Sequence, residues 1–323
     1  MTTTTRLPHA GRTSPRAPAP PDAPSPRPRP LARLAARGTP YLFIAPFFVL
    51  FAVFGLYPLL YTAWVSLHEW KMGMKGDFVG LDNYSKLFGD PDFWNALVNT
   101  VGMLVMATVP QLLLALVVAS MLNQRLRGMT FLRLGILLPI VTSVAAVGIV
   151  FSQLFDRDAG MANGLLHLVG IGPVDWRAER WSSWAAISTM VDWRWTGYNS
   201  LIYLAAMQAV PKELYEAASI DGAGRVRQLF AITVPMIRPA VIFTVISSTI
   251  AGLQLFTEPL IFAQGSNAIS GGSLRQFQTM SMFMFEKAFR NFDYGYGSAV
   301  AWMIFLIIIV LTVVNFLIVR RTR

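Results

Sequence analysis

Six long apolar stretches constrain this chain more than any other feature of its sequence. The fourth stretch is the least apolar, because it contains Asp192 and Arg194. A helix needs about 20 mostly apolar residues to cross the hydrocarbon core of a bilayer. The sequence therefore predicts an all-α integral membrane protein with six spans, and an even number of spans puts both termini on one side. The predicted spans cover about residues 41–66, 96–121, 134–155, 184–207, 240–263 and 299–319.

The composition agrees with a membrane protein and removes several kinds of chemistry. Of 323 residues, 54% are hydrophobic and only 14% are charged, which is unlike a soluble globular domain. The chain has no cysteine, so disulfides and thiolate metal sites are excluded. The three histidines (His9, His68 and His167) are scattered along the chain. We therefore expect neither a metal nor a cofactor.

The basic residues predict which side of the membrane each loop occupies. The N-terminal tail, the second loop, the segment 211–239 and the C-terminus together carry 17 lysines and arginines, whereas the opposite loops carry nine. Basic residues concentrate in the cytoplasmic loops of membrane proteins. Both termini and the segment 211–239 are therefore predicted to be cytoplasmic. The same bias explains the net charge of +10 without a nucleic-acid partner.

Residues 1–40 form a tail that differs in composition from the rest of the chain. Eight prolines fall within residues 15–30, interspersed with arginines. Such a segment cannot build a packed core, so we expect a disordered basic tail followed by a membrane domain at 41–323. Two interpretations remain open. The tail either binds membrane lipid or a partner, or it only fixes the orientation of the first span.

The segment 211–239 is a polar interruption between two apolar stretches, and it reads as two short helices. Pro211 suits a first helical turn, and the helix it starts should end near Asp221. Gly222 and Gly224 predict a sharp bend. A second short helix should follow and stop at the prolines 235 and 239. Helices this short are marginal alone, so other contacts must hold them.

The spacing inside this segment resembles a known family motif. Glu216, Ala217 and Ala218 are followed after three residues by Gly222, and after nine more by Ile-Thr-Val-Pro at 232–235. This is similar to the EAA loop in the permease subunits of ABC importers, with Val234 in place of leucine. The resemblance implies that the loop docks on a separate ATP-binding subunit. It assigns this coupling to Glu216, Ala217, Ala218, Asp221, Gly222, Ile232 and Pro235.

Two outer segments narrow the resemblance. The stretch Phe78–Tyr84 (FVGLDNY) and the stretch Tyr294–Ala299 (YGYGSA) resemble carbohydrate-uptake permeases of the maltose type, and the first stretch resembles the first of their two permease subunits. This implies a type I ABC importer permease in the bacterial plasma membrane, carrying a sugar and most simply an oligosaccharide. The partners implied are a second homologous permease, two ATP-binding subunits and an extracytoplasmic sugar-binding protein.

Four polar residues inside the predicted spans are candidates for the substrate pathway, because such residues are costly in a bilayer. Gln254 and Glu258 are one helical turn apart in the fifth span and should share a face, and Pro259 should free a backbone carbonyl beside them. Asp192 and Arg194 lie in the fourth span. They either line a cavity or a subunit interface, or the span starts later and they lie near the outer headgroups. Gln254 and Glu258 could alternatively make an internal hydrogen bond.

The remaining alternatives concern the energy source. The sequence GxxxxGK[ST] of a phosphate-binding loop is absent, so we expect no enzyme activity and an ATPase in a separate subunit. A secondary transporter driven by an ion gradient could use Asp192 and Glu258 as ion sites. That alternative predicts an inverted repeat between the chain halves, which is not evident, and it leaves the EAA spacing unexplained.

Overall fold

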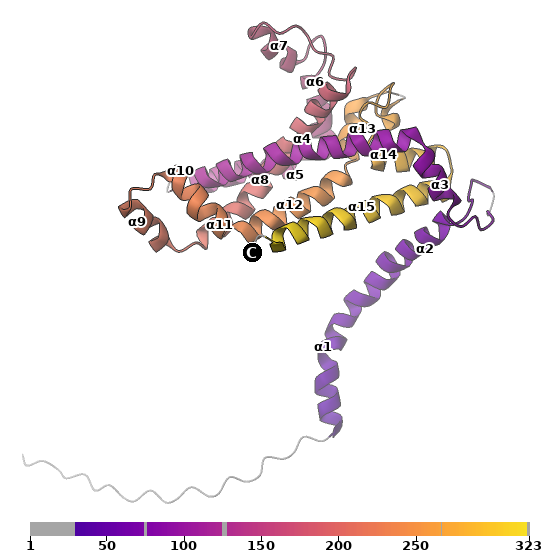
Figure 1. The fold of residues 1–323 in the computed structure, drawn as a ribbon, viewed down its shortest axis with the longest axis horizontal. Helices are drawn as coiled ribbons and strands as arrows, with labels where there is room; N and C mark the ends of the chain where they lie inside the picture. Colours follow the sequence, from indigo (N-terminus) through magenta and orange to yellow (C-terminus); the bar gives the residue numbers. More distant parts are fainter. Residues whose placement is uncertain (1–29, 74–75, 125–127, 266, 322–323) are drawn as a thin grey trace, which may run out of the picture. The chain divides into compact units, whose positions relative to one another are not determined.

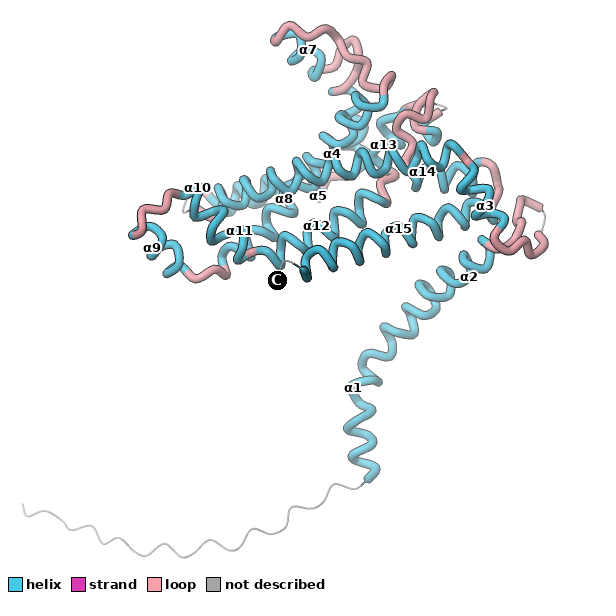
Figure 2. The backbone as a smooth tube through the Cα atoms, in the orientation of Figure 1, coloured by secondary structure: helices cyan, strands magenta, loops and turns pink. Residues whose placement is uncertain are grey.

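The computed structural model describes residues 30–73, 76–124, 128–265 and 267–321. The described residues divide into two compact units, one ending at Tyr57 and the other starting at Pro58. Both are helical, as predicted, and the second unit adds two isolated β-bridges, His68 with Phe78 and Lys71 with Asp293. Figure 2 shows helices connected by loops of differing length.

The first unit is a helical run. Helix α1, Pro30–Phe51, continues into a π-helical turn, Ala52–Leu56, and then into α2, Tyr57–Ser66, which crosses into the second unit. Residues 30–40 are therefore helical, although we predicted an irregular tail to residue 40. Leucine, alanine and arginine dominate this stretch between two prolines, and these are good helix formers. The remainder of the predicted tail lies outside the described residues.

The second unit contains the other helices. Those that build its body are α3 (Asp82–Gly89), α4 (Pro91–Leu122), α5 (Met129–Val141), α6 (Val144–Leu154), α7 (Met161–Leu168), α8 (Arg180–Gln208), α12 (Arg238–Leu253), α13 (Thr257–Ala263), α14 (Met280–Phe285) and α15 (Tyr294–Arg321). The loop between α8 and α12 contains α9 (Lys212–Ile220), α10 (Arg225–Gln228), a π-helical turn (Leu229–Thr233) and α11 (Val234–Met236). A 3₁₀ turn (Ala268–Ser270) precedes α14, and a π-helical turn (Glu286–Arg290) follows it.

Helices α4, α8, α12 and α15 lie side by side in the body of this unit (Figure 1). Helices α4 and α8 run in the same direction. Met103 near the start of α4 packs with Trp184 near the start of α8, and Ala119 near the end of α4 packs with Met207 near the end of α8. The α9–α11 loop therefore lies at the end of the body where α4 finishes, opposite α3 and α14 (Figure 1).

The predicted spans differ in how well single helices match them. Three helical runs are long and apolar enough to cross a membrane: Tyr41–Ser66, Pro91–Leu122 and Tyr294–Leu317, which match the predicted first, second and sixth spans. The third predicted span is bent by 90° between α5 and α6. The fifth is interrupted between α12 and α13. Helix α8 has 29 residues but falls outside the apolar set, and six spans therefore remain a prediction.

Candidate functional site: a polar cavity and an inner loop

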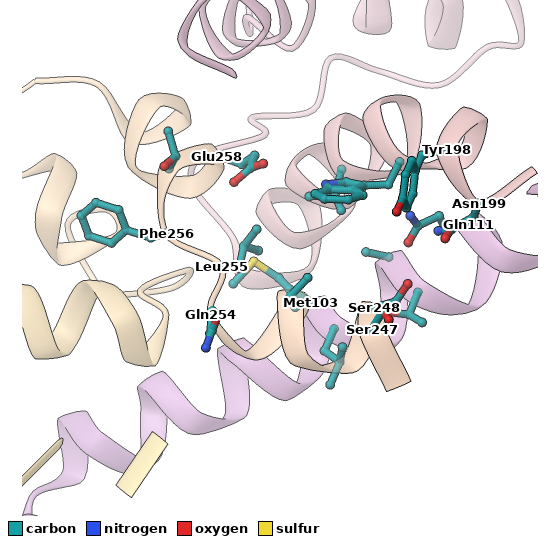
Figure 3. Close-up of a pocket in the computed structure, with 18 residues that line it drawn as sticks. Met103, Gln111, Tyr198, Asn199, Ser247, Ser248, Gln254, Leu255, Phe256 and Glu258 are labelled. Carbon is teal, nitrogen blue, oxygen red and sulfur yellow. The ribbon is translucent and has the colours of Figure 1, made fainter. Parts of the chain in front are cut away.

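A cavity of about 430 Å³ lies among α4, α8 and α12 (Figure 3). Uncharged polar side chains from all three helices line it together with apolar ones. Its polar lining consists of Thr108, Gln111, Tyr198, Asn199, Ser247, Ser248, Gln254 and Thr257, with Glu258 as the one ionisable carboxylate. Hydroxyl and amide groups both donate and accept hydrogen bonds, so this lining suits a ligand rich in hydroxyl groups.

Two amide side chains mark the part of the cavity that is formed by α4 and α8. Gln111 and Asn199 are each only 3% exposed, and the Asn199 Nδ2 atom has no hydrogen-bond partner among the described residues. They lie close together in Figure 3, near Tyr198. A buried donor without a partner is costly, and a ligand can supply that partner. The sequence analysis did not predict Gln111 and Asn199, because it considered mainly charged groups inside the spans. Uncharged polar side chains within apolar helices were the signal that could have indicated them.

The cavity owes its outer wall to a break in the fifth predicted span. Helix α12 ends at Leu253, and α13 starts at Thr257. Pro259 lies in the first turn of α13, whose N-cap is Phe256, so the Leu255 carbonyl precedes this helix and accepts no bond within it. That carbonyl instead accepts a hydrogen bond from Thr279 Oγ1, at 2.7 Å. The Leu255 carbonyl is free of helical bonds because of the break and not because of Pro259, and a side chain of the protein occupies it.

The expectation that Gln254 and Glu258 share one helical face is wrong. Gln254 caps the end of α12, whereas Glu258 lies in the first turn of α13, so no continuous helix joins them. Both nevertheless line the cavity, because the break turns α13 back toward it. Apolar periodicity cannot reveal such a break, since a bent span and a straight one have the same composition.

Glu258 and Arg194 form an ion pair that the sequence did not indicate. Arg194 Nη1 donates to Glu258 Oε1 at 2.7 Å, and the two side chains are 12% and 10% exposed. Arg194 itself is not among the lining residues. The pair joins the middle of α8 to the first turn of α13, across 64 positions of sequence.

Asp192 is separated from the other predicted pathway residues. It does not line the cavity, and its Oδ1 atom is buried without a hydrogen-bond partner among the described residues. Helix α8 begins at Arg180, before the predicted start of the fourth span at 184, and the depth of Asp192 and Arg194 in the membrane stays a prediction. Two residues apart on a helix, Asp192 and Arg194 point in different directions, and the structure does not bring them together.

The loop that carries α9–α11 between α8 and α12, called the inner loop after its predicted cytoplasmic position, contains the predicted bend at Gly222. Its φ angle is +77°, in the left-handed region that favours glycine. The amide of Ala223 donates to the Ala218 carbonyl at 2.8 Å, and that of Gly222 donates to the Ser219 carbonyl at 3.1 Å. These two bonds form a Schellman motif that ends α9. Gly222 is therefore required by the backbone conformation at the helix end.

Hydrogen bonds hold the two short helical segments together. Tyr215 on α9 shares a hydrogen bond with Thr233, at 2.9 Å, and Thr233 is buried. Gln228 Nε2 donates to Ser219 Oγ and to the Ala223 carbonyl, both at 2.9 Å. These contacts cross the bend, which answers how helices too short to be stable alone keep their arrangement.

The prolines of this loop act differently from the prediction. Pro235 lies within α11, and the chain bends at Ile237, which is buried. Pro239 is in the first turn of α12, where a missing N–H costs nothing, so it begins a helix and does not end one. The bend between residues 225–236 and α12 is 73°.

The outer surface of the loop is apolar and exposed. Ile220 is 88% exposed, and three more large apolar side chains are exposed to a smaller extent: Leu214, Val226 and Phe230. Glu216 and Ala217 are also exposed, whereas Ala218 is half-buried. Exposed apolar side chains clustered on one loop mark an interaction surface.

The two outer motifs meet in space. Asn83, from the first motif, donates Nδ2 to the backbone carbonyls of Ser66 and His68, at 2.9 and 3.0 Å. The amide of Gly295, from the second, donates to the Trp70 carbonyl at 3.1 Å. Both motifs thus fix the loop that follows α2. In the described structure these contacts position the loop between α2 and α3 against the start of α15.

A second group of ion pairs joins the start of α4 to the segment around α14. Arg275, with a positive φ of 55°, lies 2.6 Å from Glu286 and 3.2 Å from Asp92. Gln278 Nε2 donates to Glu286 at 2.7 Å, and Asn99 Nδ2 donates to the Arg275 carbonyl at 2.9 Å. Burial raises the pKa of Glu286, but hydrogen bonds from Arg275 and Gln278 outweigh it and lower that pKa below its ordinary value.

The fold and the cavity define a multi-pass membrane permease, and comparison with known proteins identifies its family. Residues 100–323 match the family described as "Binding-protein-dependent transport system inner membrane component". The chain belongs to this family of inner-membrane permeases of ABC importers. This membership confirms the predicted resemblance to ABC importer permeases.

Several relatives are permease proteins of sugar transport systems. The chain is 37% identical to the lactose transport system permease protein LacF of Rhizobium radiobacter, over 88% of this chain and 94% of that protein. It is 34% identical to the arabinooligosaccharides transport system permease protein AraP of Halalkalibacterium halodurans, over 85% of each chain.

A solved structure has the same fold. It is a bacterial alginate ABC transporter in complex with an alginate pentasaccharide-bound periplasmic protein, with a TM-score of 0.77 over 91% of this chain and 98% of the other. At 19% identity the similarity concerns the fold alone.

Proposed function

We propose that this chain forms half of the translocation pathway for a sugar, most simply an oligosaccharide, in an ATP-driven importer that depends on a binding protein. The observation that carries the proposal is the cavity, whose lining combines hydroxyl and amide groups with the aromatic residues Trp195, Tyr198 and Phe256. Sugars offer hydroxyl groups for hydrogen bonds and apolar ring faces for aromatic contact. The names of the relatives, which include lactose and arabinooligosaccharide permeases, support the same substrate class.

Within the cavity, Gln254 and Glu258 are proposed to contact the passing sugar. Glu258 offers a carboxylate acceptor, and hydrogen bonds to an ionised acceptor are stronger than neutral ones. Gln111 and Asn199 are added to this set on the evidence of their burial. Asp192 is not retained as a direct contact because it lies away from the lining.

The inner loop is proposed to couple this pathway to ATP hydrolysis. Glu216, Ala217, Ala218, Asp221 and Gly222 would dock into a groove of an ATP-binding subunit, with Ile232 and Pro235 anchoring the loop to the body. The exposed apolar side chains Leu214, Ile220 and Val226 support a helix-in-groove contact. The complete transporter would contain a second homologous permease, two ATP-binding subunits and an extracytoplasmic sugar-binding protein.

The proposed orientation has six spans with both termini and the EAA loop in the cytoplasm. It rests on the segregation of basic residues, 17 against nine. A reporter fused after Arg323 should be active only if it works in the cytoplasm, and one inserted near Gly271 should behave as external. The reverse pattern would overturn the orientation.

A blocked cavity tests the transport role. The assembled transporter is reconstituted in liposomes and assayed with lactose, maltose, trehalose, arabinooligosaccharides and diacetylchitobiose. Ser248→Trp places a large ring in the cavity and should reduce uptake to background, while the subunits still purify together. Ser85→Trp, on the exposed surface of α3, is the matched control and should transport normally. Normal uptake by Ser248→Trp would remove the cavity from the pathway.

The structure gives no support to a transporter driven by an ion gradient through Asp192 and Glu258. Glu258 is paired with Arg194, and Asp192 lies outside the cavity. Neither carboxylate is thus available as an ion site within the cavity.

A further inference from the structure

The ion pair between Arg194 and Glu258 has a consequence for the charge of the cavity. Glu258 is 7% exposed and is the one ionisable carboxylate in the cavity lining. Among the described residues, none that lines the cavity is a lysine, arginine or histidine. The charge that a substrate meets is therefore decided by Glu258 and by whatever neutralises it.

Arg194 supplies this neutralisation through its ion pair with Glu258. Its Nη1 atom is 2.7 Å from Glu258 Oε1, a charge-assisted hydrogen bond of normal length. Because Arg194 is not a lining residue, its guanidinium acts on the cavity through the carboxylate it holds. Its Nε atom is buried without a hydrogen-bond partner among the described residues, so Glu258 is the contact that accounts for its position.

The placement of the two residues makes the pair a fixed feature of the cavity. Arg194 is in the middle of the 29-residue helix α8, and Glu258 is on the short helix α13 that follows the break in the fifth predicted span. Residue Ile261 of the same short helix packs closely on Gly148 of α6, where an added Cβ would come within 2.7 Å. Helix α13 is thus held on two sides, and Glu258 has little freedom to turn away from Arg194.

We propose that Arg194 is a specificity-determining positioning residue: it neutralises Glu258 and fixes its carboxylate at the cavity wall, so that the cavity selects uncharged, hydroxyl-rich substrates. The inference rests on the proposed function, since selection presumes that substrates pass through the cavity. An acidic sugar would meet a carboxylate without a free cationic group nearby. A cationic substrate would find the carboxylate already paired. A neutral sugar can donate a hydroxyl hydrogen bond to the Glu258 carboxylate while that carboxylate stays paired with Arg194.

The absence of cysteine from the sequence makes the charge of the cavity directly measurable. Ser248→Cys introduces the one thiol of this chain, on α12 at the cavity wall, with almost no change in size, and the reaction is followed on this chain. The purified complete transporter is then treated with a cationic and with an anionic methanethiosulfonate reagent of similar size. The ratio of the two reaction rates reports the local potential. Ser85→Cys on the exposed surface of α3 gives the reference ratio.

Removing the charge of Arg194 and removing the charge of Glu258 should shift the ratio of the two rates in opposite directions. In the Ser248→Cys background the ratio should stay close to that of the reference. Adding Arg194→Gln leaves a carboxylate unpaired. The rate with the cationic reagent should then rise and the rate with the anionic reagent should fall, each by on the order of ten-fold. Adding Glu258→Gln should shift the ratio toward the anionic reagent. The double variant should return to the reference ratio, and Arg194→Lys should stay near it.

Three results would overturn the proposal: a ratio unaffected by either single change, a shift of the same sign in both, or a thiol that reacts with neither reagent. Arg194→Gln and Glu258→Gln are expected to shift the rate ratio in opposite directions, so either variant tests the proposal if the other does not assemble. Uptake of lactose and of its carboxylate derivative lactobionate by the unmodified transporter adds a functional arm. Uptake of lactobionate at or above the rate of lactose would also overturn it. Failure of all the neutral sugars in the panel, with the predicted reagent ratios, would instead refute the proposed function.

Discussion

Replacing Gly222 isolates the contribution of one backbone conformation to coupling. Gly222 has a φ of +77°, and a Cβ added there would meet no atom within 4 Å. A side chain at this position therefore has room, and its cost is backbone strain of about 1–2 kcal/mol for an ordinary L-residue. Such an energy changes the ratio of formed to unformed bend by roughly 5- to 30-fold. It is also comparable to typical coupling energies between two sites, about 1–3 kcal/mol.

Three variants separate strain from other effects. Gly222→Asn is the control, because asparagine tolerates the left-handed region and adds no charge. Gly222→Val should lose most activity, since a β-branched residue is a strong outlier there. Gly222→Asp should retain less activity than Gly222→Asn, because it adds a negative charge at the C-terminal end of α9, where the helix dipole disfavours such a charge.

The assay is stimulation of ATP hydrolysis by the binding protein in reconstituted transporter, measured beside sugar uptake. All three variants should insert and assemble like the parent, because the added side chains meet open space. Equal stimulation in Gly222→Val and Gly222→Asn would refute the reasoning. A loss in Gly222→Asn as severe as that in Gly222→Val would refute it as well.

Three further predictions concern other parts of the chain. Gly197→Val should prevent stable assembly, because a Cβ at Gly197 would lie 1.9 Å from the Ile136 carbonyl oxygen; yields of intact complex like those of the parent would contradict this. Glu286→Gln should lower stability by about 1–3 kcal/mol at neutral pH through the lost contact with Arg275. Because the fold lowers the pKa of Glu286, the stability difference between parent and variant should persist as the pH falls to 4.5, the ordinary pKa, and should shrink below it. Thermal unfolding between pH 7 and pH 4 measures this difference. A difference that already shrinks above pH 4.5 would show that the pKa of Glu286 is not lowered. Deletion of residues 2–28 should leave uptake largely intact, and loss of the assembled complex would instead identify the tail as a docking element.

The helical fold and the inner loop could be predicted because their signals are local. Apolar length predicted the helices of the first, second and sixth spans, and glycine at 222 predicted the bend that its positive φ confirms. Asn83 and Gly295 were recognised as parts of motifs, although their structural contacts were not foreseen. Local sequence carries these features because each depends on neighbouring residues only.

The cavity could be predicted only in part because its walls come from distant segments. Gln254 and Glu258 were found through the cost of polar groups in apolar spans, but the break between them was not. The break between α12 and α13 leaves the Leu255 carbonyl without a helical partner, and only the fold brings Thr279 to bind it. The pairing of Arg194 with Glu258 likewise depends on the packing of α8 against α13, which no spacing in the sequence encodes.

The energy source of uptake tests the central claim most directly. Liposomes containing the complete transporter are given binding protein and lactose or another sugar of the panel, with ATP inside or with an imposed proton or sodium gradient. We predict uptake that requires ATP and the binding protein and is unaffected by either gradient. Uptake driven by a gradient in the absence of ATP would contradict the account.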